Sequence, residues 1–519
     1  MPCPYSIQKA RYFAGLIHLA SRAEHSQNIF LLYIHQHSLH TNTVVKKLNL
    51  FNGRKGILSE GQRNMEIFNE PNISIGTPTA VEKPRLSLFD QINLNVVWLV
   101  NNFQWQALLA VTVPSMVAHL LDPAQKSINL AIVVTTGTLV AVVVNPLFGT
   151  LSDYATFRLG RRRPFLIIGT SLSIIVLLLF AFAPSRFSAG ALLFTFALLF
   201  LLLQFCNNLA VAPWSAIIAD KVPQNQRGLS SGMYGLLSLL GTIIGSLVAG
   251  FILGGNLPLP VYRQAIVQVF LVIVAVQIVL VTYTIITVKE VPLPPEQHVK
   301  LSLRILTKDF FFKPSQYPDI SWVLLARFLV MMAIWSVYYF LLYYFDDVLG
   351  GKGVKTILLN TPFSGEQFNG VLFQPIVLLM ALPTSILAGW ASDRWGRKKF
   401  VYVSGIMMAI VCLVFIFFQN QYAALISGAC FGIGYGAYTS VDWALMTDVL
   451  PSADKAGKFM GIWSAISILP QVVGITIGGV ILQLLQSIPH HFGYTTLFVL
   501  VVLYLLFGTL VIQRVKGSK

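Results

Sequence analysis

The most constraining feature of this sequence is a series of continuous apolar runs, each long enough to cross a bilayer as a helix. About 20 apolar residues span the ~30 Å hydrocarbon core of a membrane, where a backbone must satisfy its own hydrogen bonds. A transmembrane barrel would instead show alternating segments of about ten residues. The runs therefore predict an all-α integral membrane protein with twelve transmembrane helices. The predicted spans are 92–120, 127–152, 165–184, 189–219, 229–253, 263–288, 321–345, 366–392, 400–419, 422–448, 458–486 and 492–513.

The composition excludes most other classes of protein. Charged residues make up 11% of the 519 residues and hydrophobic residues 55%, whereas a soluble domain carries about 25% charged residues. Soluble enzymes, coiled coils and disordered chains are therefore excluded. The formal net charge is +16, but the basic residues form short clusters between the apolar runs, where they set topology, so we expect no nucleic-acid partner. The four cysteines show no metal-ligand or disulfide spacing, and we expect no metal and no cofactor.

Lysine and arginine are distributed unequally between the loops. They are several-fold more frequent after even-numbered spans and in the C-terminal tail than after odd-numbered spans. Because Lys and Arg are enriched on the cytoplasmic side of a membrane, this bias predicts that both termini are cytoplasmic. We expect a multi-pass protein embedded in a lipid bilayer, with the cell membrane as its location.

Residues 1–86 differ from the rest of the chain. They are polar and of mixed composition, and five of the nine histidines fall in the first forty positions without a repeated metal-ligand spacing. We expect a poorly ordered N-terminal extension here. An alternative start of translation at Met65 would remove residues 1–64, and the sequence leaves both alternatives open.

Several short motifs recur in the same order along the chain. Gly149 and Asp153 end the second span, Gly389 and Asp393 end the eighth, and a basic turn follows each pair. An aspartate also ends both the fourth and the tenth span, and glycines match between the fifth and the eleventh. These matches predict two six-helix pseudo-repeats. The predicted parts are an N-terminal half at 87–288, a cytoplasmic linker at 289–320, and a C-terminal half with a short cytoplasmic tail at 321–519.

The repeated motifs resemble those of a known superfamily. The run from Gly389 to Lys399 is similar to the loop signature of the major facilitator superfamily, whose two six-helix halves are related by an axis along the membrane normal. The first copy of the motif, at 152–165, and the paired Asn207 and Asn208 resemble the sucrose–proton symporters and the glycoside–pentoside–hexuronide cation symporters. The resemblance implies a secondary active transporter that works by alternating access, with sugar–proton symport as the leading function.

The loops after spans 2 and 8 act, in this superfamily, as a latch that stabilises the outward-open state. A purely topological role would explain the arginines but not the recurrence of Asp and Gly in both halves. The resemblance implies this gating role for Gly149, Asp153, Arg158, Gly160, Arg161, Arg162, Gly389, Asp393, Arg394, Gly396 and Arg397.

The chain departs from these relatives at the positions that couple transport to ions. Plant-type sucrose symporters carry an aspartate three residues before the paired asparagines, and that acid is their proton site. Here the position is Gln204, which cannot titrate. Melibiose-type sodium symporters use acids in the second span, and 127–152 contains none. Neither of the relatives' coupling sites is therefore present in its usual form.

Polar and aromatic side chains line up along one face of spans 1, 4, 7 and 10 at 100° per residue. The resemblance places these four spans around a central cavity. The stripes predict a pathway for a small-molecule substrate, and the alternative is that the amides hydrogen-bond between helices and only hold the bundle together. The predicted pathway residues are Asn95, Asn102, Gln106, Gln204, Asn207, Asn208, Tyr338, Tyr435 and Thr439.

Two ionisable residues lie deep within predicted spans. Arg327 and Asp442 lie at similar depths in spans 7 and 10, where an unpaired charge would cost about 2.5–3.5 kcal/mol on insertion scales. We expect the two side chains to form a pair. In one interpretation the pair couples transport to protons, and in the other it is a fixed salt bridge between the two helices.

Three other functions are alternatives to sugar–proton symport. An enzyme would need at least two convergent catalytic groups, and the sequence contains no catalytic motif. Aromatic residues near the stripes, such as Trp335 and Tyr435, suit a sugar ring, and they suit the flat apolar substrate of a drug or metabolite exporter nearly as well. A pigment- or lipid-assembly factor on the same fold is the alternative without transport. A monomer is sufficient for this fold, so we expect a monomer.

Overall fold

The computed structural model describes residues 85–223, 226–255, 257–290, 314–350, 354–355, 362–449 and 456–516. The chain divides into two units, residues 1–81 and 82–519, and every contact discussed below lies within the second. Nearly all of the predicted extension at 1–86 and most of the predicted linker at 289–320 lie outside the described residues.

The N-terminal half is a bundle of long helices, two of which are interrupted. The first span begins at a capping box, in which Ser87 Oγ accepts the N–H of Asp90 and the Asp90 carboxylate accepts the N–H of Ser87. Its elements are α5 (Leu88–Gln106), the π-helix η1 (Ala107–Thr112), α6 (Val113–Leu120), the 3₁₀ turn η2 (Pro123–Gln125), α7 (Lys126–Asp153), α8 (Arg163–Arg186), α9 (Ala189–Ser215), α10 (Ile217–Lys221), α11 (Arg227–Leu253) and α12 (Leu259–Thr287).

The C-terminal half repeats this plan with more breaks. Its elements are η5 (Pro314–Gln316), α14 (Pro318–Tyr338), α15 (Leu341–Tyr344), the π-helix η6 (Phe345–Gly350), the strands β1 (Val354–Lys355) and β2 (Pro362–Phe363), α16 (Gly365–Gln367), the π-helix η7 (Phe368–Phe373), α17 (Gln374–Trp395), α18 (Arg397–Phe417), α19 (Gln421–Asp448), α20 (Ala456–Leu485), α21 (Phe492–Val511) and η9 (Ile512–Arg514). The two strands form one antiparallel pair, the only strand pairing in the described part of the chain.

The prediction of an all-helical bundle of twelve spans is confirmed. In the described residues, eleven helical segments are long and apolar enough to cross a membrane. The twelfth span is α19, which carries Gly, Tyr and Asp residues and packs between α17 and α18. The seventh predicted span is interrupted at Tyr339 and Phe340, between α14 and α15, and the fourth is interrupted at Ala216, between α9 and α10.

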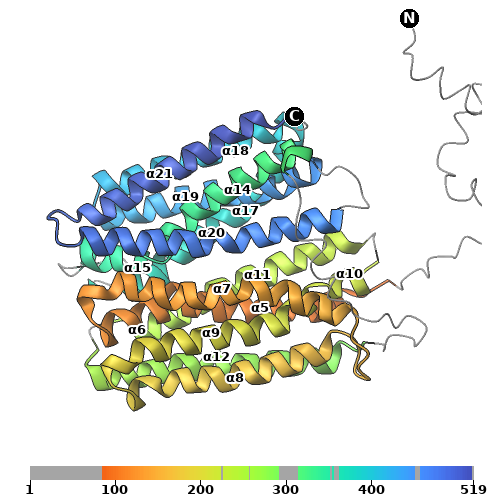
Figure 1. The fold of residues 1–519 in the computed structure, drawn as a ribbon, viewed down its shortest axis with the longest axis horizontal. Coiled ribbons are helices and arrows are strands. Elements are labelled where there is room, and N and C mark those ends of the chain that lie inside the picture. The colour runs from red at the N-terminus through yellow and green to blue at the C-terminus, as the bar shows by residue number, and fades with distance from the viewer. Residues whose placement is uncertain are drawn as a thin grey trace, which may run out of the picture. The chain divides into compact units, whose positions relative to one another are not determined.

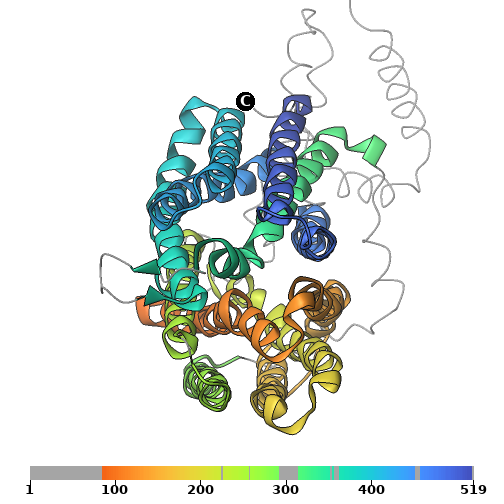
Figure 2. The ribbon, with the colours of Figure 1, turned by 90° about the vertical axis from the view of Figure 1, so that its left-hand side faces the viewer.

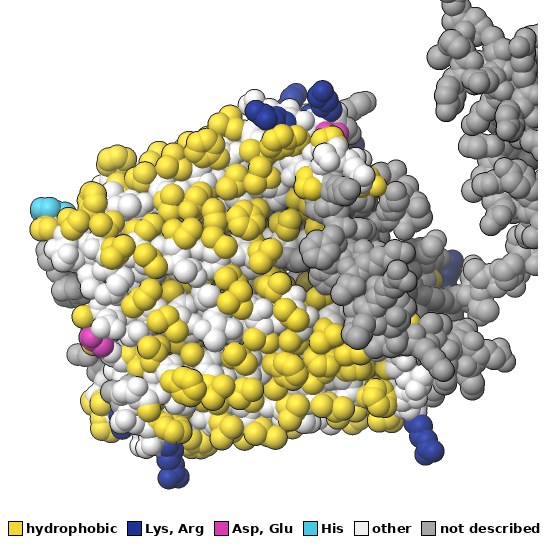
Figure 3. Space-filling model, viewed as in Figure 1, with side chains coloured by type: hydrophobic (Ala, Val, Ile, Leu, Met, Phe, Trp, Pro, Cys, Tyr) yellow, Lys and Arg dark blue, Asp and Glu magenta, His cyan; other side chains and the backbone are white. Residues whose placement is uncertain are grey.

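The helices form two bundles that lie side by side, α5–α12 in one and α14–α21 in the other (Figure 1). When the molecule is seen from one end, the same two groups lie one above the other and are in contact (Figure 2). Large apolar side chains, including Phe194, Val279 and Ile386, are exposed on the outer surface of these bundles. Apolar side chains cover much of one face, and most of the visible charged side chains lie toward its ends (Figure 3). This distribution is typical of a surface that faces lipid.

The two ends of the bundle carry different loops and turns. The basic end carries the loop at 154–162 and the turn at Gly396, and it lies on the right in Figure 1. The opposite end carries η2, η6 and α16. In the described residues, the hydrogen bonds and ion pairs that we find between the two halves all lie between the middle of the bundle and the opposite end. The halves are thus joined by polar contacts at one end and not, among these residues, at the other.

Candidate functional site

A cavity of about 260 Å³ lies between the two halves. Its walls differ in chemistry, because most of the polar groups come from the N-terminal half and most of the aromatic rings from the C-terminal half. No charged side chain is found among the described residues that line it. The polar lining comprises Asn102, Gln106, Thr242 and Gln374, and the aromatic lining comprises Trp335, Tyr338, Phe373, Phe415, Phe431 and Tyr435.

One hydrogen bond crosses this cavity. The hydroxyl of Tyr338 donates to Oε1 of Gln106 over 2.7 Å and so joins α14 to α5. Nε2 of Gln106 is buried and has no hydrogen-bond partner among the described residues. A buried amide N–H without a partner is rare and marks a place where a ligand or water can bind. Trp335 packs edge-on against Tyr338, with ring centroids 5.3 Å apart.

The ion pair expected in the membrane is present. Arg327 donates from Nη1 to Oδ2 of Asp442, and the two residues are 7% and 3% exposed. Tyr438 donates its hydroxyl to Oδ1 of the same carboxylate over 3.2 Å, and Nη2 of Arg327 donates to Ser467 Oγ over 2.8 Å. A buried pair is tolerated when further hydrogen bonds satisfy both charged groups in this way. Neither charged side chain lines the 260 Å³ cavity, whose nearest lining residue on α19 is Tyr435.

The other predicted pathway residues lie away from this cavity. Asn95 Nδ2 donates to the carbonyl and hydroxyl oxygens of Ser230 and so ties α5 to α11. Asn145 Nδ2 donates to Asn208 Oδ1 over 3.2 Å, and Asn208 in turn donates to the carbonyl of Gln204 over 2.8 Å. These amides connect helices within the N-terminal half.

Two more predicted pathway residues are also absent from the cavity lining. The hydroxyl of Thr439 donates to the carbonyl of Gly436 in its own helix. Asn207 lines a separate cavity of about 20 Å³ inside the N-terminal half. The central cavity therefore contains Asn102, Gln106, Tyr338 and Tyr435 of the predicted set.

A cluster of charges closes the N-terminal loop at the basic end. Arg162 is 2% exposed, and it donates from Nη2 to Asp153 over 2.5 Å and from Nε to Asp220 over 3.0 Å. Arg161 also contacts Asp220, at 2.8 Å. The aspartates that end α7 and α10 are thereby held together by one arginine from the loop, all within one half.

The C-terminal half repeats this cluster. Arg397 contacts Asp448 at 3.0 Å and Asp393 at 3.3 Å, so one arginine again joins two helix-terminal aspartates. The neighbouring Arg394 lies over the ring of Trp390, with its guanidinium carbon 4.2 Å from the ring centroid. The two clusters are alike in geometry but not in register, because Arg397 directly follows Gly396 whereas Arg162 lies two positions after Gly160.

Two glycines allow these loops to turn. Gly160 has φ +101° and Gly396 has φ +94°, a left-handed conformation that glycine adopts without steric strain. A Cβ at position 160 would also lie 2.3 Å from Cβ of Glu290, whose carboxylate accepts the N–H groups of Arg162 and Arg163. The recurrence of glycine in both motifs follows from this backbone geometry.

The remaining residues of the predicted gating loops are either exposed on the surface or loosely packed. Arg158 is exposed on the surface of its loop. A Cβ at Gly149 would meet no atom within 4 Å, and one at Gly389 would meet only Ser440, at 3.9 Å. The faces of α7 and α17 that carry these glycines are therefore loosely packed at the basic end.

The polar contacts at the opposite end are not predictable from the sequence pattern. Glu366 is 3% exposed, and its Oε1 accepts a hydrogen bond of 2.9 Å from Ser115 Oγ in the other half. Ser115 Oγ also lies 2.6 Å from the hydroxyl of Tyr262. Glu366 begins a predicted span, a position typical of a solvated charge, so only its partner on α6 reveals its burial.

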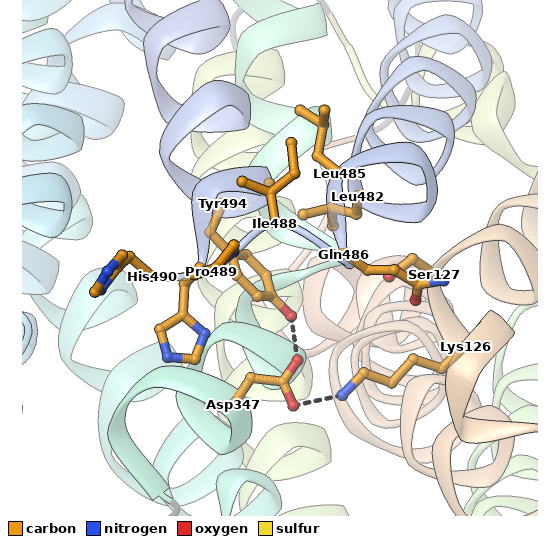
Figure 4. Close-up of a pocket in the computed structure, with 12 residues that line it drawn as sticks. Lys126, Ser127, Asp347, Leu482, Leu485, Gln486, Ile488, Pro489, His490 and Tyr494 are labelled. Atoms are coloured by element: carbon orange, nitrogen blue, oxygen red, sulfur yellow. Dashed lines mark hydrogen bonds and ion pairs between the residues drawn. The ribbon is translucent and has the colours of Figure 1, made fainter.

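A second missed contact borders a pocket of about 430 Å³ at the opposite end (Figure 4). Asp347 accepts hydrogen bonds from Lys126 Nζ and from the hydroxyl of Tyr494, each over 2.6 Å (Figure 4). Lys126 belongs to one half and Asp347 to the other, so this ion pair also crosses between the halves. No group of three or more His, Cys, Asp or Glu that could hold a metal ion is found in the described residues.

Two helical bundles with a cavity between them, and with one charged cluster at the same end of each, define a membrane transporter of small solutes. The chain belongs to the Major Facilitator Superfamily, whose family model matches residues 96–365 and 372–517. The prediction that it is a transporter and not an enzyme is thereby confirmed.

Curated relatives match at low identity. The General alpha-glucoside permease of Schizosaccharomyces pombe is 31% identical over 180 residues, which cover 32% of this chain and 31% of the permease. The Sucrose transport protein SUC4 of Arabidopsis thaliana is 23% identical over 461 residues, which cover 79% of this chain and 88% of that protein.

Solved structures match over nearly their whole length. The crystal structure of a D-xylose-proton symporter aligns with a TM-score of 0.61 at 17% identity and covers 83% of this chain and 99% of that chain. A bacterial homologue of the human lysosomal transporter Spinster, in an inward-facing and unoccupied conformation, aligns with a TM-score of 0.59 at 14% identity. That match covers 82% of this chain and 95% of that chain.

Proposed function

We propose that this protein is a sugar–proton symporter that binds its sugar in the cavity between the two halves. The observation that carries the proposal is the chemistry of the cavity, where the amide Nε2 of Gln106 has no hydrogen-bond partner among the described residues and aromatic rings form much of the lining, with no charged side chain. Sugar hydroxyls are satisfied by amide groups, and the apolar face of a sugar ring packs on aromatic rings. A monomer contains the whole cavity, so the monomer is the functional unit in this proposal.

The similar proteins support the same substrate class. The relatives that match in sequence are named an alpha-glucoside permease and a sucrose transport protein, and one similar fold is that of a D-xylose-proton symporter. The motif at 152–165 and the paired Asn207 and Asn208 carry the resemblance within this chain.

In an alternating-access mechanism, each end of the bundle faces one side of the membrane. The basic end is cytoplasmic in this proposal, because Lys and Arg gather there. The polar contacts between the halves lie toward the opposite end, so in this proposal they hold that end closed. Rocking of the halves about the cavity would break those contacts and expose the sugar to the other side.

The Arg327–Asp442 pair is the coupling element in this proposal. A proton on Asp442 would neutralise the carboxylate that holds Arg327, and it would weaken the link between α14 and α19. Such a change can shift a pre-existing balance between two conformations. The Arg162 and Arg397 clusters are intact within each half, and they serve as the gating latch when the basic end closes.

The decisive experiment measures uptake of radiolabelled sucrose and maltose into proteoliposomes, with and without an inward proton gradient. Accumulation that depends on the gradient and that a protonophore abolishes is the expected result. Absence of uptake by folded protein would contradict the sugar assignment and leave the fold unaffected.

Asp442→Asn tests the coupling element. We expect a folded protein that still exchanges sugar across the membrane but no longer accumulates it in response to a proton gradient. Asp122→Asn, at an exposed turn where the side chain caps η2, is the matched control and should retain accumulation. If Asp442→Asn fails to fold, the pair is a fixed salt bridge between α14 and α19.

A further inference from the structure

A small cavity inside the N-terminal half contains several polar atoms without partners. It has a volume of about 20 Å³ and lies between α5, α8, α9 and α12. Four buried side-chain atoms of its lining have no hydrogen-bond partner among the described residues, and these atoms are Asn101 Oδ1, Gln104 Nε2, Ser173 Oγ and Gln277 Oε1. Unsatisfied buried polar atoms are individually costly and rare, so four in one place require an explanation.

The four atoms do not satisfy each other fully. Nε2 of Gln277 donates to Oε1 of Gln104, which leaves one amide donor and one amide acceptor free. Turning both amides over reverses the roles and still leaves one donor and one acceptor. The side chains of Gln104, Ser173 and Gln277 are buried, at 0%, 2% and 4% exposure, so the surrounding lipid and bulk solvent do not reach them.

The donor and acceptor pattern identifies the missing partner. Asn101 Oδ1 and Gln277 Oε1 accept hydrogen bonds, Gln104 Nε2 donates one, and the Ser173 hydroxyl can donate or accept. A water molecule donates two bonds and accepts two, which matches this set. A cation would be repelled by the amide N–H of Gln104. The volume also fits, because a cavity needs about 10–15 Å³ to hold one water.

We propose that this cavity binds one ordered water molecule, which bonds to Asn101, Gln104, Ser173 and Gln277 and joins α5 to α8 and α12. Asn101 and Gln104 lie on the back of α5, whereas Asn102 and Gln106 of the same helix line the central cavity. The water therefore fixes the rotation of the helix that presents those two amides. It is a structural ligand of one half and stands independently of the proposed sugar.

The direct test is a cryo-electron microscopy map of the full chain in lipid nanodiscs, at a resolution where ordered water is visible elsewhere in the protein. We expect one density peak at about 3 Å from each of the four atoms. An empty cavity in such a map would overturn the proposal.

Ser173→Ala gives a second test whose sign is decisive. If water is bound, the variant removes one of its four bonds, and we expect the melting temperature to fall by about 2 °C. If the cavity is dry, the same change removes an unsatisfied hydroxyl and the melting temperature rises, which would overturn the proposal. Ser404→Ala is the matched control, because that buried hydroxyl bonds to the carbonyl of Val401 in its own helix.

Exchange of the salt separates water from a cation. We expect the same melting temperature in sodium, potassium and choline chloride. A stabilisation specific to sodium that disappears in Gln277→Leu would overturn the water assignment and identify the cavity as a cation site.

Discussion

The basic end and the opposite end of the bundle use charged residues in different ways. At the basic end, Arg162 and Arg397 each join two aspartates of their own half. At the opposite end, Glu366 and Lys126 contact residues of the other half. Contacts within a half persist when the halves move as rigid bodies, whereas contacts between halves must break. The charged residues that make contacts within one half therefore stabilise the fold of that half. Those that make contacts between the halves stabilise this conformation.

The glycines show the same division. A Cβ at Gly241 or Gly245 would approach the backbone of α5 within its own half, at 2.2 and 2.3 Å. Gly250 instead faces the backbone of Glu366, and its counterpart Gly479 faces that of Ser127. Small residues that are related by the repeat thus form the contact between the halves at the opposite end.

The largest expected effect is a loss of stability when a charged residue that stabilises the fold of one half is removed. Arg162→Ala should lower the free energy of unfolding by about 3 kcal/mol, because it removes three hydrogen bonds of a buried guanidinium, each worth about 1 kcal/mol. Arg397→Ala should cost about 1 kcal/mol, because Arg397 is 20% exposed and its ion pairs are screened by solvent. Thermal unfolding in detergent measures both. Exposed Arg158→Ala is the control, and equal losses in Arg162→Ala and Arg397→Ala would contradict the comparison.

Ser115→Ala should open the opposite end without unfolding the protein. It removes the donor to Glu366 across the halves, and a hydrogen bond to a charged group contributes about 2 kcal/mol, or about thirtyfold in population. Distances between spin labels at the exposed positions 125 and 487 should lengthen. Ser185→Ala, whose hydroxyl bonds only to its own helix, should leave the distances unchanged, and so should Arg162→Ala.

Acidity should favour closure of the opposite end. Burial, together with the nearby Glu366 carboxylate, raises the pKa of Asp346 from 3.8 to about 7, and the N–H of Gly365 and the charge of Lys126 oppose the shift. Opening would solvate Asp346 and return its pKa toward the ordinary value, so closing takes up a proton. Closure is therefore most stable below about pH 4 and loses this contribution as the pH rises through about 7.

The same spin-label distances test this pH dependence. Several other polar groups face the site, namely His119 from α6, Tyr262 from α12, Tyr343 from α15, Asp347 from η6 and Tyr494 from α21. Asp346→Asn should abolish the dependence between pH 4 and 7, whereas Asp122→Asn should preserve it. Persistence of the full dependence in Asp346→Asn would assign the titration to another of these groups.

The smallest effect is expected at Lys126. Its pair with Asp347 is partly exposed, at 20% and 33% for the two side chains, and such pairs contribute about 0.5 kcal/mol. At low salt, Lys126→Met should increase the population with long spin-label distances about twofold. At high salt it should leave that population unchanged. A shift independent of salt would show that packing, and not charge, joins the halves here.

Much of the fold follows from patterns that are local in the sequence. Run length predicts the helices, and the repeated Gly and Asp predict two halves whose loops prove alike in side-chain geometry. The pairing of Arg327 with Asp442 was predictable because a buried charge requires a partner. The break at Tyr339 and Phe340 was not, since both residues are as apolar as the run around them.

The side to which an amide points is harder to predict. Asn95 lies on the same helical line as the cavity residues Asn102 and Gln106, yet it bonds to Ser230 within the N-terminal half. Asn208 bonds to Asn145 in the same half, and no described residue of α9 lines the cavity. Spacing gives the direction around a helix, but which neighbour occupies that direction depends on packing between helices far apart in sequence. Glu366 was missed for the same reason, because its burial depends on Ser115.

The π-helix η1 has a mechanical consequence. A π-helical turn contains one more residue than an α-helical turn. If η1 changed to α-helical hydrogen bonding, the segment that follows it would rotate about the helix axis, by up to about 100° for each residue by which the helical pattern shifts. The segment beyond η1 is α6, which carries Ser115 and His119. A small change of winding between α5 and α6 could therefore swing both residues away from Glu366 while Asn102 and Gln106 keep their places. The contact with Glu366 at the opposite end and the lining of the central cavity would then belong to two parts of a single span that move separately.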